Sequence, residues 1–355
     1  MSRTFRNVLV TGGAGFIGSN FIRWLFHEPS FNGRIVNYDV LTYAGNPLSL
    51  QDVAKEFGPR YVFVKGDICD ADLVRKTIRD YGIDAIVHFA AESHVDRSIA
   101  HPDAFVKTNI YGTYVLLEAA RESAGQVKHF HHISTDEVFG SLGAQGFFTE
   151  DTPYSPNSPY SASKASSDHL VRAYHNTFGL PTTLSNCSNN YGPFQFPEKL
   201  IPLMILNALE GKPLPVYGEG LNVRDWLYVT DHCSAIWTIV QNAEYGTTYN
   251  VGGRNELSNI AVVRKICELL DKRVGLLPSG KTHDSLITHV KDRPGHDLRY
   301  AIDCSKLVRD FAWAPAQTWE TGFAQTVDWY LANPTWIAQV RSGEYQRWIQ
   351  TQYSL

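Results

Sequence analysis

Long hydrophobic runs, cysteine clusters and an excess of positive charge are all missing from this 355-residue sequence. No apolar stretch reaches membrane-spanning length, and the N-terminal segment passes from two arginines into a strand without the apolar region of a secretory signal. We therefore expect a cytoplasmic protein without a membrane partner. The five cysteines lie far apart with no CxxC spacing, which indicates neither a metal site nor a disulfide framework. The net charge of −4 argues against a nucleic-acid partner.

Short β-rich segments alternate with longer helical patterns through the first half of the chain. This alternation is typical of a Rossmann-type, doubly wound parallel sheet with helices on both faces, an α/β fold. The expected strands are Asn7–Thr11, Arg34–Asp39, Tyr61–Lys65, Ala85–Ala90 and Lys128–Ser134, and the expected helices are Phe16–His27, Asp70–Tyr81 and Asp103–Ser123.

Proline and glycine clusters interrupt this alternation after Tyr191, which predicts a second, smaller α/β domain. Strand-like segments at Trp226–Val229 and Thr248–Val251 indicate that the chain crosses back, so the two domains are expected to be interleaved. We assign residues 1–190, with returning segments near 226–258, to a dinucleotide-binding domain. Residues 191–225 and 259–355 are assigned to the smaller, substrate-binding domain.

A glycine-rich segment follows the first predicted strand and opens a helix. Gly12, Gly15 and Gly18 have the spacing of a dinucleotide fingerprint, in which glycines permit a tight turn and close approach of the backbone to a pyrophosphate. The second strand ends at Asp39, 21 residues beyond Gly18, where an acid binds a ribose 2′-hydroxyl and repels a 2′-phosphate. The combination predicts NAD rather than NADP as cofactor.

Tyr160 and Lys164 are four residues apart near the start of a long helical pattern, so both side chains share one helical face. A nearby cation, helped by a positive nicotinamide ring, stabilises phenolate and lowers the pKa of a tyrosine toward the operating range. The pair therefore predicts a general base that accepts a proton from a substrate hydroxyl while hydride leaves for NAD.

Two adjacent acids, Asp136 and Glu137, follow a buried-strand pattern that runs from Val127 to Ile133. Taken alone, the pair fits a solvated turn or a helix N-cap. Beside a dinucleotide fingerprint and a Tyr/Lys pair, two carboxylates of different ionisation would instead supply one base and one acid.

The glycines, the Tyr160/Lys164 pair and the chain length resemble the extended short-chain dehydrogenase/reductases. Within that superfamily, further segments resemble the dTDP-glucose 4,6-dehydratases across nearly the whole chain. These segments are 41–46, 90–98, 132–138, 160–168, 189–193, 196–202, 224–226 and 292–297. The resemblance implies a nucleotide-sugar substrate, dTDP-glucose, and a hydro-lyase of deoxysugar biosynthesis.

The resemblance also implies a role for each catalytic residue. Tyr160 takes the C4 proton beside Thr135, while Lys164 anchors the nicotinamide ribose. Glu137 is the base at C5, and Asp136 is the acid that protonates the departing C6 hydroxyl. Hydride then returns to C6, so NAD is regenerated at each turnover and stays tightly bound. Like-charge repulsion in a water-poor site is expected to keep Asp136 protonated.

Two sets of binding residues are implied by the same resemblance. Residues expected to bind the cofactor are Gly12, Gly15, Phe16, Ile17, Gly18, Asp39, Leu41, Thr42, Asp67, Ile68, Ala90, Ala91, Ser93, Thr108, Tyr160, Lys164 and Asn190. Residues expected to bind the substrate are His94, Thr135, Asn189, Lys199, Leu200, Pro215, Tyr217, Arg224, Asn259, Arg293, His296 and Tyr353.

One departure from the family pattern is Phe139, which stands where we expect a tyrosine and removes a hydroxyl beside the acid pair. Apolar residues on several faces of the segment Phe105 to Ala120 indicate burial in the core or a partner. The resemblance favours a homodimer. A nucleotide-sugar 4-epimerase, a dehydratase for a different nucleotide sugar, and a non-catalytic NAD-binding regulator are the alternative functions.

Overall fold

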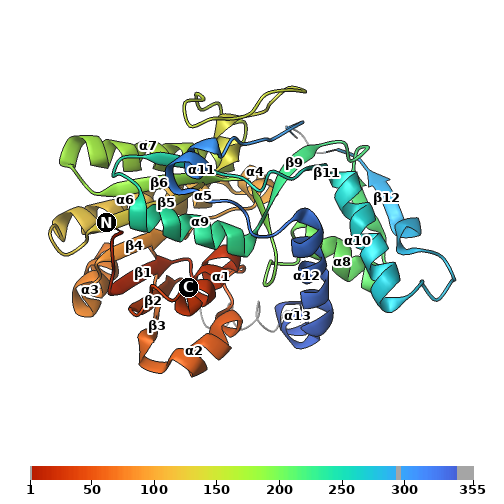
Figure 1. The fold of residues 1–355 in the computed structure, drawn as a ribbon, viewed down its shortest axis with the longest axis horizontal. Coiled ribbons are helices and arrows are strands. Elements are labelled where there is room, and N and C mark those ends of the chain that lie inside the picture. Colours follow the sequence, from red (N-terminus) through yellow and green to blue (C-terminus); the bar gives the residue numbers. More distant parts are fainter. Residues whose placement is uncertain (1, 293–296, 342–355) are drawn as a thin grey trace.

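The computed structural model describes residues 2–292 and 297–341 and is built around a seven-stranded parallel sheet (Figure 1). The strand order β10-β6-β5-β4-β1-β2-β3 contains the Rossmann order 3-2-1-4-5-6 with one further strand beyond β6. The predicted fold class is therefore confirmed. The strands are β1 (Asn7–Thr11), β2 (Arg34–Asp39), β3 (Tyr61–Lys65), β4 (Ala85–His88), β5 (His129–Thr135), β6 (Thr182–Cys187) and β10 (Thr248–Val251).

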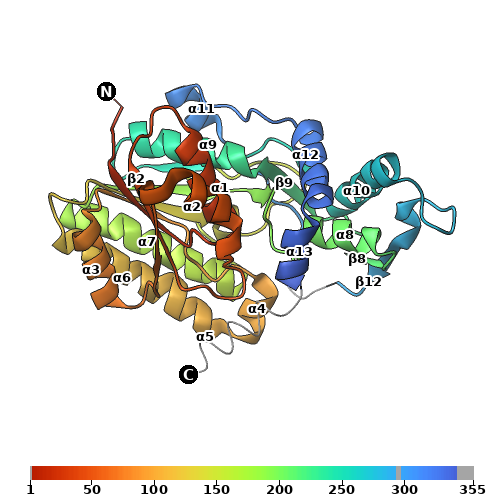
Figure 2. The same ribbon diagram turned by 90° about the horizontal axis from the view of Figure 1, so that it is seen from below.

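Alternating side chains of the buried strands pack into two separate cores. In β1, Val8 and Val10 belong to one hydrophobic cluster and Leu9 belongs to the other. Helices α1 (Phe16–His27), α2 (Gln51–Phe57) and α9 (Val229–Asn242) cover the first face. Helices α3 (Ala71–Tyr81), α6 (Thr113–Glu122) and α7 (Pro159–Phe178) cover the second, as the turned view shows (Figure 2).

A second lobe lies beside the end of the sheet, at the right of Figure 1. It holds a three-stranded sheet, β11-β9-β7, and a two-stranded sheet, β12-β8. Its strands are β7 (Asn189–Tyr191), β8 (Leu214–Tyr217), β9 (Val223–Tyr228), β11 (Glu256–Ser258) and β12 (Ile287–Val290). Its helices are α8 (Leu200–Leu209), α10 (Asn259–Val274), α12 (Trp319–Ala332) and α13 (Pro334–Arg341).

The chain returns from this lobe to the main sheet, although not through the first segment that we expected. The strand at Trp226 pairs with β7 and β11 in the small sheet, whereas α9 packs on α1 and β10 pairs in parallel with β6. The domain bounds given above stay a prediction.

The helix expected over 103–123 is divided by a wider turn. It consists of α5 (Pro102–Phe105), a π-helical segment (Val106–Gly112) and α6. The buried Asn109 side chain bonds both backbone groups of Glu92, and Thr113 Oγ1 donates to the Asn109 carbonyl at 2.6 Å. The Thr113 hydroxyl competes with the regular helical ladder for the Asn109 carbonyl, as is common at a wider turn.

The remaining elements are short. They are α4 (Val95–Ala100), α11 (Ser305–Phe311) and 3-10 turns at Pro47–Leu50, Gly58–Arg60, Asp136–Phe139 and His283–Leu286. The helix expected from Asp70 begins one residue later because the Asp70 side chain caps it, accepting from the Leu73 N–H. Across the described ranges, no helix has both the length and the apolar character needed to cross a bilayer.

Candidate functional site

A cavity of about 400 Å³ runs along the carboxyl ends of the central strands. Its lining extends from the glycine turn after β1 to the acid segment after β5, and reaches residues 195–199 at the second lobe. In a doubly wound sheet this edge is the usual place for ligands, because neighbouring strand ends diverge where the strand order reverses.

The glycine turn leaves no room for side chains where a diphosphate would lie. Gly12 has a φ of +69°, and a Cβ there would come within 2.6 Å of the Ala90 backbone nitrogen. A Cβ on Gly18 would lie 2.3 Å from the Gly12 carbonyl oxygen. Gly15 precedes α1 and offers no side-chain cap to the helix N–H groups. The turn therefore fits an anionic diphosphate held by backbone donors.

Asp39 ties the expected ribose position to this turn. Its Oδ2 accepts from the Ala14 N–H at 2.9 Å, and its Oδ1 accepts from the Leu41 N–H at 2.8 Å. Burial raises the pKa of Asp39, and these two backbone hydrogen bonds oppose the rise. Two donors fixed on one carboxylate hold it rigidly at the end of β2.

All but one of the expected cofactor residues line the cavity. Leu41 does not, because its side chain is buried in the protein next to Asp39. The others are Gly12, Gly15, Phe16, Ile17, Gly18, Asp39, Thr42, Asp67, Ile68, Ala90, Ala91, Ser93, Thr108, Tyr160, Lys164 and Asn190.

The two adjacent acids occupy different environments. Thr135 ends β5 and caps the following 3-10 turn, and its Oγ1 accepts from the Glu137 N–H at 3.3 Å. Glu137 lines the cavity, whereas Asp136 is only 1% exposed. The interpretation of the pair as a solvated turn is therefore wrong for Asp136.

Asp136 has the environment of a neutral carboxyl group. Burial raises its pKa well above the usual value, and the charges of Glu137 and Asp225 raise it further. Arg224 and a hydrogen bond from Thr135 oppose the rise. Its Oδ2 has no hydrogen-bond partner among the described residues. A buried acid in this state can donate a proton.

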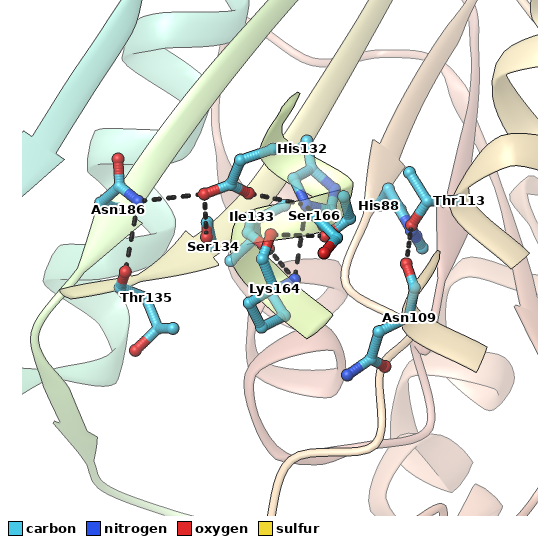
Figure 3. Close-up of polar contacts among 12 residues, drawn as sticks. His88, Asn109, Thr113, His132, Ile133, Ser134, Thr135, Lys164, Ser166 and Asn186 are labelled. Atoms are coloured by element: carbon cyan, nitrogen blue, oxygen red, sulfur yellow. Dashed lines mark hydrogen bonds and ion pairs between the residues drawn. The ribbon is translucent and has the colours of Figure 1, made fainter. Parts of the chain in front are cut away.

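Tyr160 and Lys164 both lie buried on α7, whose start is fixed by Ser158 in a reciprocal cap with Ser161. The Lys164 Nζ donates to the Ile133 carbonyl at 2.7 Å and lies 3.4 Å from the His132 Nε2 (Figure 3). Burial lowers the pKa of Lys164, and the charge of Asp168 opposes this.

The predicted fall in the pKa of Tyr160 is not found among the chain's own groups. Burial raises that pKa well above 10, and the charge of Glu137 raises it further, while a hydrogen bond from Thr135 opposes the rise. Lys164 directs its ammonium group at a backbone carbonyl instead. Helical spacing placed the two side chains on one face without deciding where the ammonium points.

Asp168 is a buried acid that the sequence reasoning did not assign to the site. It accepts from Ser134 Oγ at 2.7 Å and from the Tyr154 hydroxyl at 2.9 Å, and its Oδ1 lies 3.3 Å from His132 Nε2. Its position four residues after Lys164, on the same helical face, is the signal that would have identified it.

Fewer of the expected substrate residues than of the expected cofactor residues line the cavity. Thr135, Asn189 and Lys199 line the cavity, whereas six others lie outside its lining: His94, Leu200, Pro215, Tyr217, Arg224 and Asn259. Arg224 is buried in β9, where its guanidinium donates to the Asp297 carbonyl at 3.0 Å and stacks on Tyr300. Arg293, His296 and Tyr353 lie outside the described residues.

Several lining residues were not predicted. They are Tyr38, Val40, Ala44, Gly45, Gly66, Phe89, Glu92, Ile133, Ser134, Cys187, Ser188, Gln195, Phe196 and Glu198. Most stand beside a predicted residue at a strand end, so adjacency along the chain was the available signal.

Comparisons with known proteins find nucleotide-sugar 4,6-dehydratases similar to this chain. The family model for GDP-mannose 4,6 dehydratase matches residues 9–326. The dTDP-glucose 4,6-dehydratase of Shigella flexneri is 54% identical, over 98% of each chain. The enzyme of that name from Neisseria meningitidis serogroup B is 55% identical, over 96% of this chain and 98% of that one.

Solved structures give the same result. The Bacillus anthracis dTDP-glucose 4,6-dehydratase in complex with NAD has a TM-score of 0.85 and 47% identity, covering 95% of this chain and 100% of that one. DesIV from Streptomyces venezuelae, with NAD and TYD bound, has a TM-score of 0.87 and 45% identity, covering 94% and 100%. A Thermotoga maritima UDP-glucose 4-epimerase is 25% identical, with a TM-score of 0.82, over 92% of this chain and 99% of that one.

Proposed function

Because this chain belongs to the dTDP-glucose 4,6-dehydratase family of the extended short-chain dehydrogenase/reductases, we infer that it is an NAD-dependent hydro-lyase. It converts dTDP-glucose to dTDP-4-keto-6-deoxyglucose. The observation that carries this function is the acid pair at the cavity, with Glu137 on the lining, Asp136 buried behind it and Tyr160 alongside.

NAD, when bound, supplies the acceptor for hydride from C4 and the donor that returns it to C6. The glycine turn would hold its diphosphate, since α1 begins there without a side-chain cap on its first N–H groups. Asp39 would bind the adenosine ribose and repel a 2′-phosphate. Lys164 would anchor the nicotinamide ribose from the floor of the cavity.

Each catalytic side chain has a separate proton to handle. Tyr160 accepts the C4 hydroxyl proton as that carbon is oxidised to a ketone. The ketone acidifies C5, where Glu137 is the base. Asp136 gives its proton to the C6 hydroxyl, which leaves as water. The raised pKa of Asp136, caused by burial and by the neighbouring Glu137 charge, supports this division.

The nucleotide end of the substrate is proposed from the resemblance. Asn189 lines the cavity and, with His94, would lie near the sugar and pyrophosphate. Lys199 also lines the cavity and would lie near the nucleotide. The remaining predicted contacts are Leu200, Pro215, Tyr217, Arg224, Asn259, Arg293, His296 and Tyr353. Arginines suit a diphosphate because their donors bind oxygen pairs.

The direct test is an incubation of the purified protein with dTDP-glucose, followed by mass spectrometry and absorbance in alkali. Loss of one water with formation of the 4-keto-6-deoxy chromophore is the expected result. UDP-glucose and GDP-mannose are the matched alternative donors. Turnover of one of them without turnover of dTDP-glucose would refute the nucleotide assignment, and a 4-epimer of unchanged mass would refute the dehydration.

A homodimer is proposed as the working form. Large apolar side chains remain exposed on these helices: Val106 at 55% and Tyr111 at 49% on the π-helical segment, Tyr114 at 41% on α6, and Phe178 at 52% at the end of α7. Pairing of these helices with those of a second copy would cover them. Sedimentation equilibrium should give twice the chain mass, and Tyr114→Glu should shift the protein toward monomer.

A cytoplasmic location is also proposed. All five cysteines are described as free thiols, which agrees with a reducing compartment. Fractionation of cells that express the tagged protein would test this location.

A further inference from the structure

The proposed chemistry leaves one proton in the wrong place after each turnover. Tyr160 gains the proton of the C4 hydroxyl, and Asp136 loses the proton that leaves in water. Glu137 takes the C5 proton and returns one to C5, so its state does not change. The hydride that leaves C4 reaches C6. Both residues return to their starting protonation states only if Tyr160 then loses one proton and Asp136 gains one.

Bulk water has poor access to either group. Tyr160 is 9% exposed and Asp136 is 1% exposed. Among the charged neighbours of Asp136, Glu137 returns its proton to C5 in the proposed chemistry. Arg224 stays protonated in proteins, and the Asp225 oxygens accept from the Gly253 and Asn255 N–H groups. An internal route is therefore favoured.

The Thr135 hydroxyl lies between the two groups. Its Oγ1 donates to the Asp136 Oδ1 at 3.4 Å, and its interaction with Tyr160, which lines the same cavity, lowers the pKa of that tyrosine. The same oxygen accepts from the Glu137 backbone N–H, which fixes its position at the start of the 3-10 turn. A hydroxyl offers one donor and two acceptor sites, so these three partners use its full capacity.

We propose that Thr135 is a proton relay that resets the site, passing its own proton to Asp136 while it takes the proton of Tyr160. Before the transfer, Tyr160 donates to Thr135 and Thr135 donates to Asp136. Afterwards, both hydrogen bonds point the other way, with Tyr160 ionised and Asp136 neutral. One O–H bond breaks and one forms at Thr135, and no other reactant is needed. This role rests on the proposed function and applies after the C4 hydroxyl, which Thr135 is expected to contact before hydride transfer, has become a ketone.

Thr135→Val tests the relay, because valine keeps the shape of threonine and lacks the hydroxyl. Resting enzyme already holds a neutral Asp136, so the first turnover needs no reset. Rapid-quench measurements should show a burst of one product per active site and then a steady phase slower by about tenfold or more. Thr135→Ser retains the hydroxyl and should remove the burst.

A loss of positioning alone would change the time course differently. Without the contact to the C4 hydroxyl, the first and later turnovers of Thr135→Val would slow equally. Absence of a burst, whether both phases are fast or slow, would overturn the relay. The wild-type reaction with dTDP-glucose separates this result from failure of the proposed function, because a wild type without product refutes the function instead.

Infrared difference spectroscopy gives a readout that does not depend on the rate. The protonated carboxyl band of Asp136, assigned by its loss in Asp136→Asn, should disappear from Thr135→Val after a single turnover. It should persist in the wild type and in Thr135→Ser. A band that persists in Thr135→Val would contradict the relay.

Discussion

The cofactor end and the sugar end of the cavity are assembled in different ways. At the cofactor end, Gly12, Asp39, Asp67 and Ala90 each stand at or just after the carboxyl end of a neighbouring parallel strand. The sheet itself brings these positions together. At the sugar end, Asn189 and Lys199 come from the second lobe, and other expected contacts lie outside the cavity lining.

The two ends also use different physical means. The cofactor end presents backbone groups and small residues, so its function depends on space and on local dihedral angles. Next to the sugar end, the catalytic end holds the buried ionisable side chains of Asp136, Tyr160 and Lys164, whose protonation depends on neighbours from several elements. A defect at the first should change binding, and a defect at the second should change chemistry.

Replacement of the two acids gives the largest expected effects and separates two steps at the catalytic end. Glu137→Gln should block exchange of the C5 proton with solvent deuterium. Asp136→Asn should permit that exchange while slowing water loss by about 10²- to 10⁴-fold. Mass spectrometry of substrate and product in deuterated water measures both. Equal loss of both reactions in both variants would contradict the separate roles.

Gly12→Ala tests the dependence of the cofactor end on space. The φ of +69° and the 2.6 Å approach to the Ala90 nitrogen leave no place for a methyl group. We expect affinity for NAD to fall by about 10- to 100-fold, as measured by calorimetry. Gly143→Ala is the matched control, since a Cβ there meets nothing within 4 Å. Equal affinities in the two variants would show that the turn tolerates a side chain.

Asp168→Asn tests the charge balance beneath the catalytic end. Burial lowers the pKa of Lys164 and the Asp168 charge raises it, so removing that charge lowers the pKa further. The ammonium is then lost at lower pH, and the alkaline limb of the kcat profile should move down by about 1 pH unit.

Ser134→Ala is the control for that shift, because it removes one donor to Asp168 and keeps the carboxylate charge. Its alkaline limb should move less. Identical limbs in the wild type and in Asp168→Asn would exclude Asp168 as the counter-charge of Lys164.

Phe139→Tyr is expected to have the smallest effect. The Phe139 ring lies in a buried apolar cluster, with its centroid 5.1 Å from that of Phe148 and 5.2 Å from that of Tyr154. Restoring the family's hydroxyl should leave kcat within about twofold. The buried hydroxyl should lower the free energy of unfolding by about 1–2 kcal/mol, measured by urea denaturation. A large rise in kcat would show that the missing hydroxyl matters to the chemistry.

The sequence predicted the parts of the site that depend on residue spacing within a single structural unit. The glycine turn, Asp39 and the Tyr160/Lys164 pair each depend on spacing within one strand–turn–helix unit or one helix. Asp168 follows the same spacing rule, since it stands four residues after Lys164, so its position was also predictable from the sequence. The bonds between the Asn109 side chain and the Glu92 backbone join two different segments, so spacing within one element does not predict them.

The sequence by itself determined the parallel sheet and the cofactor turn, because these follow from local periodicity and spacing. Only the tertiary structure decided that burial and nearby charges raise the pKa values of Asp136 and Tyr160, and that Lys164 donates to the Ile133 carbonyl. Ionisation depends on burial and on charges from distant segments, and these distances exist only once the chain has folded.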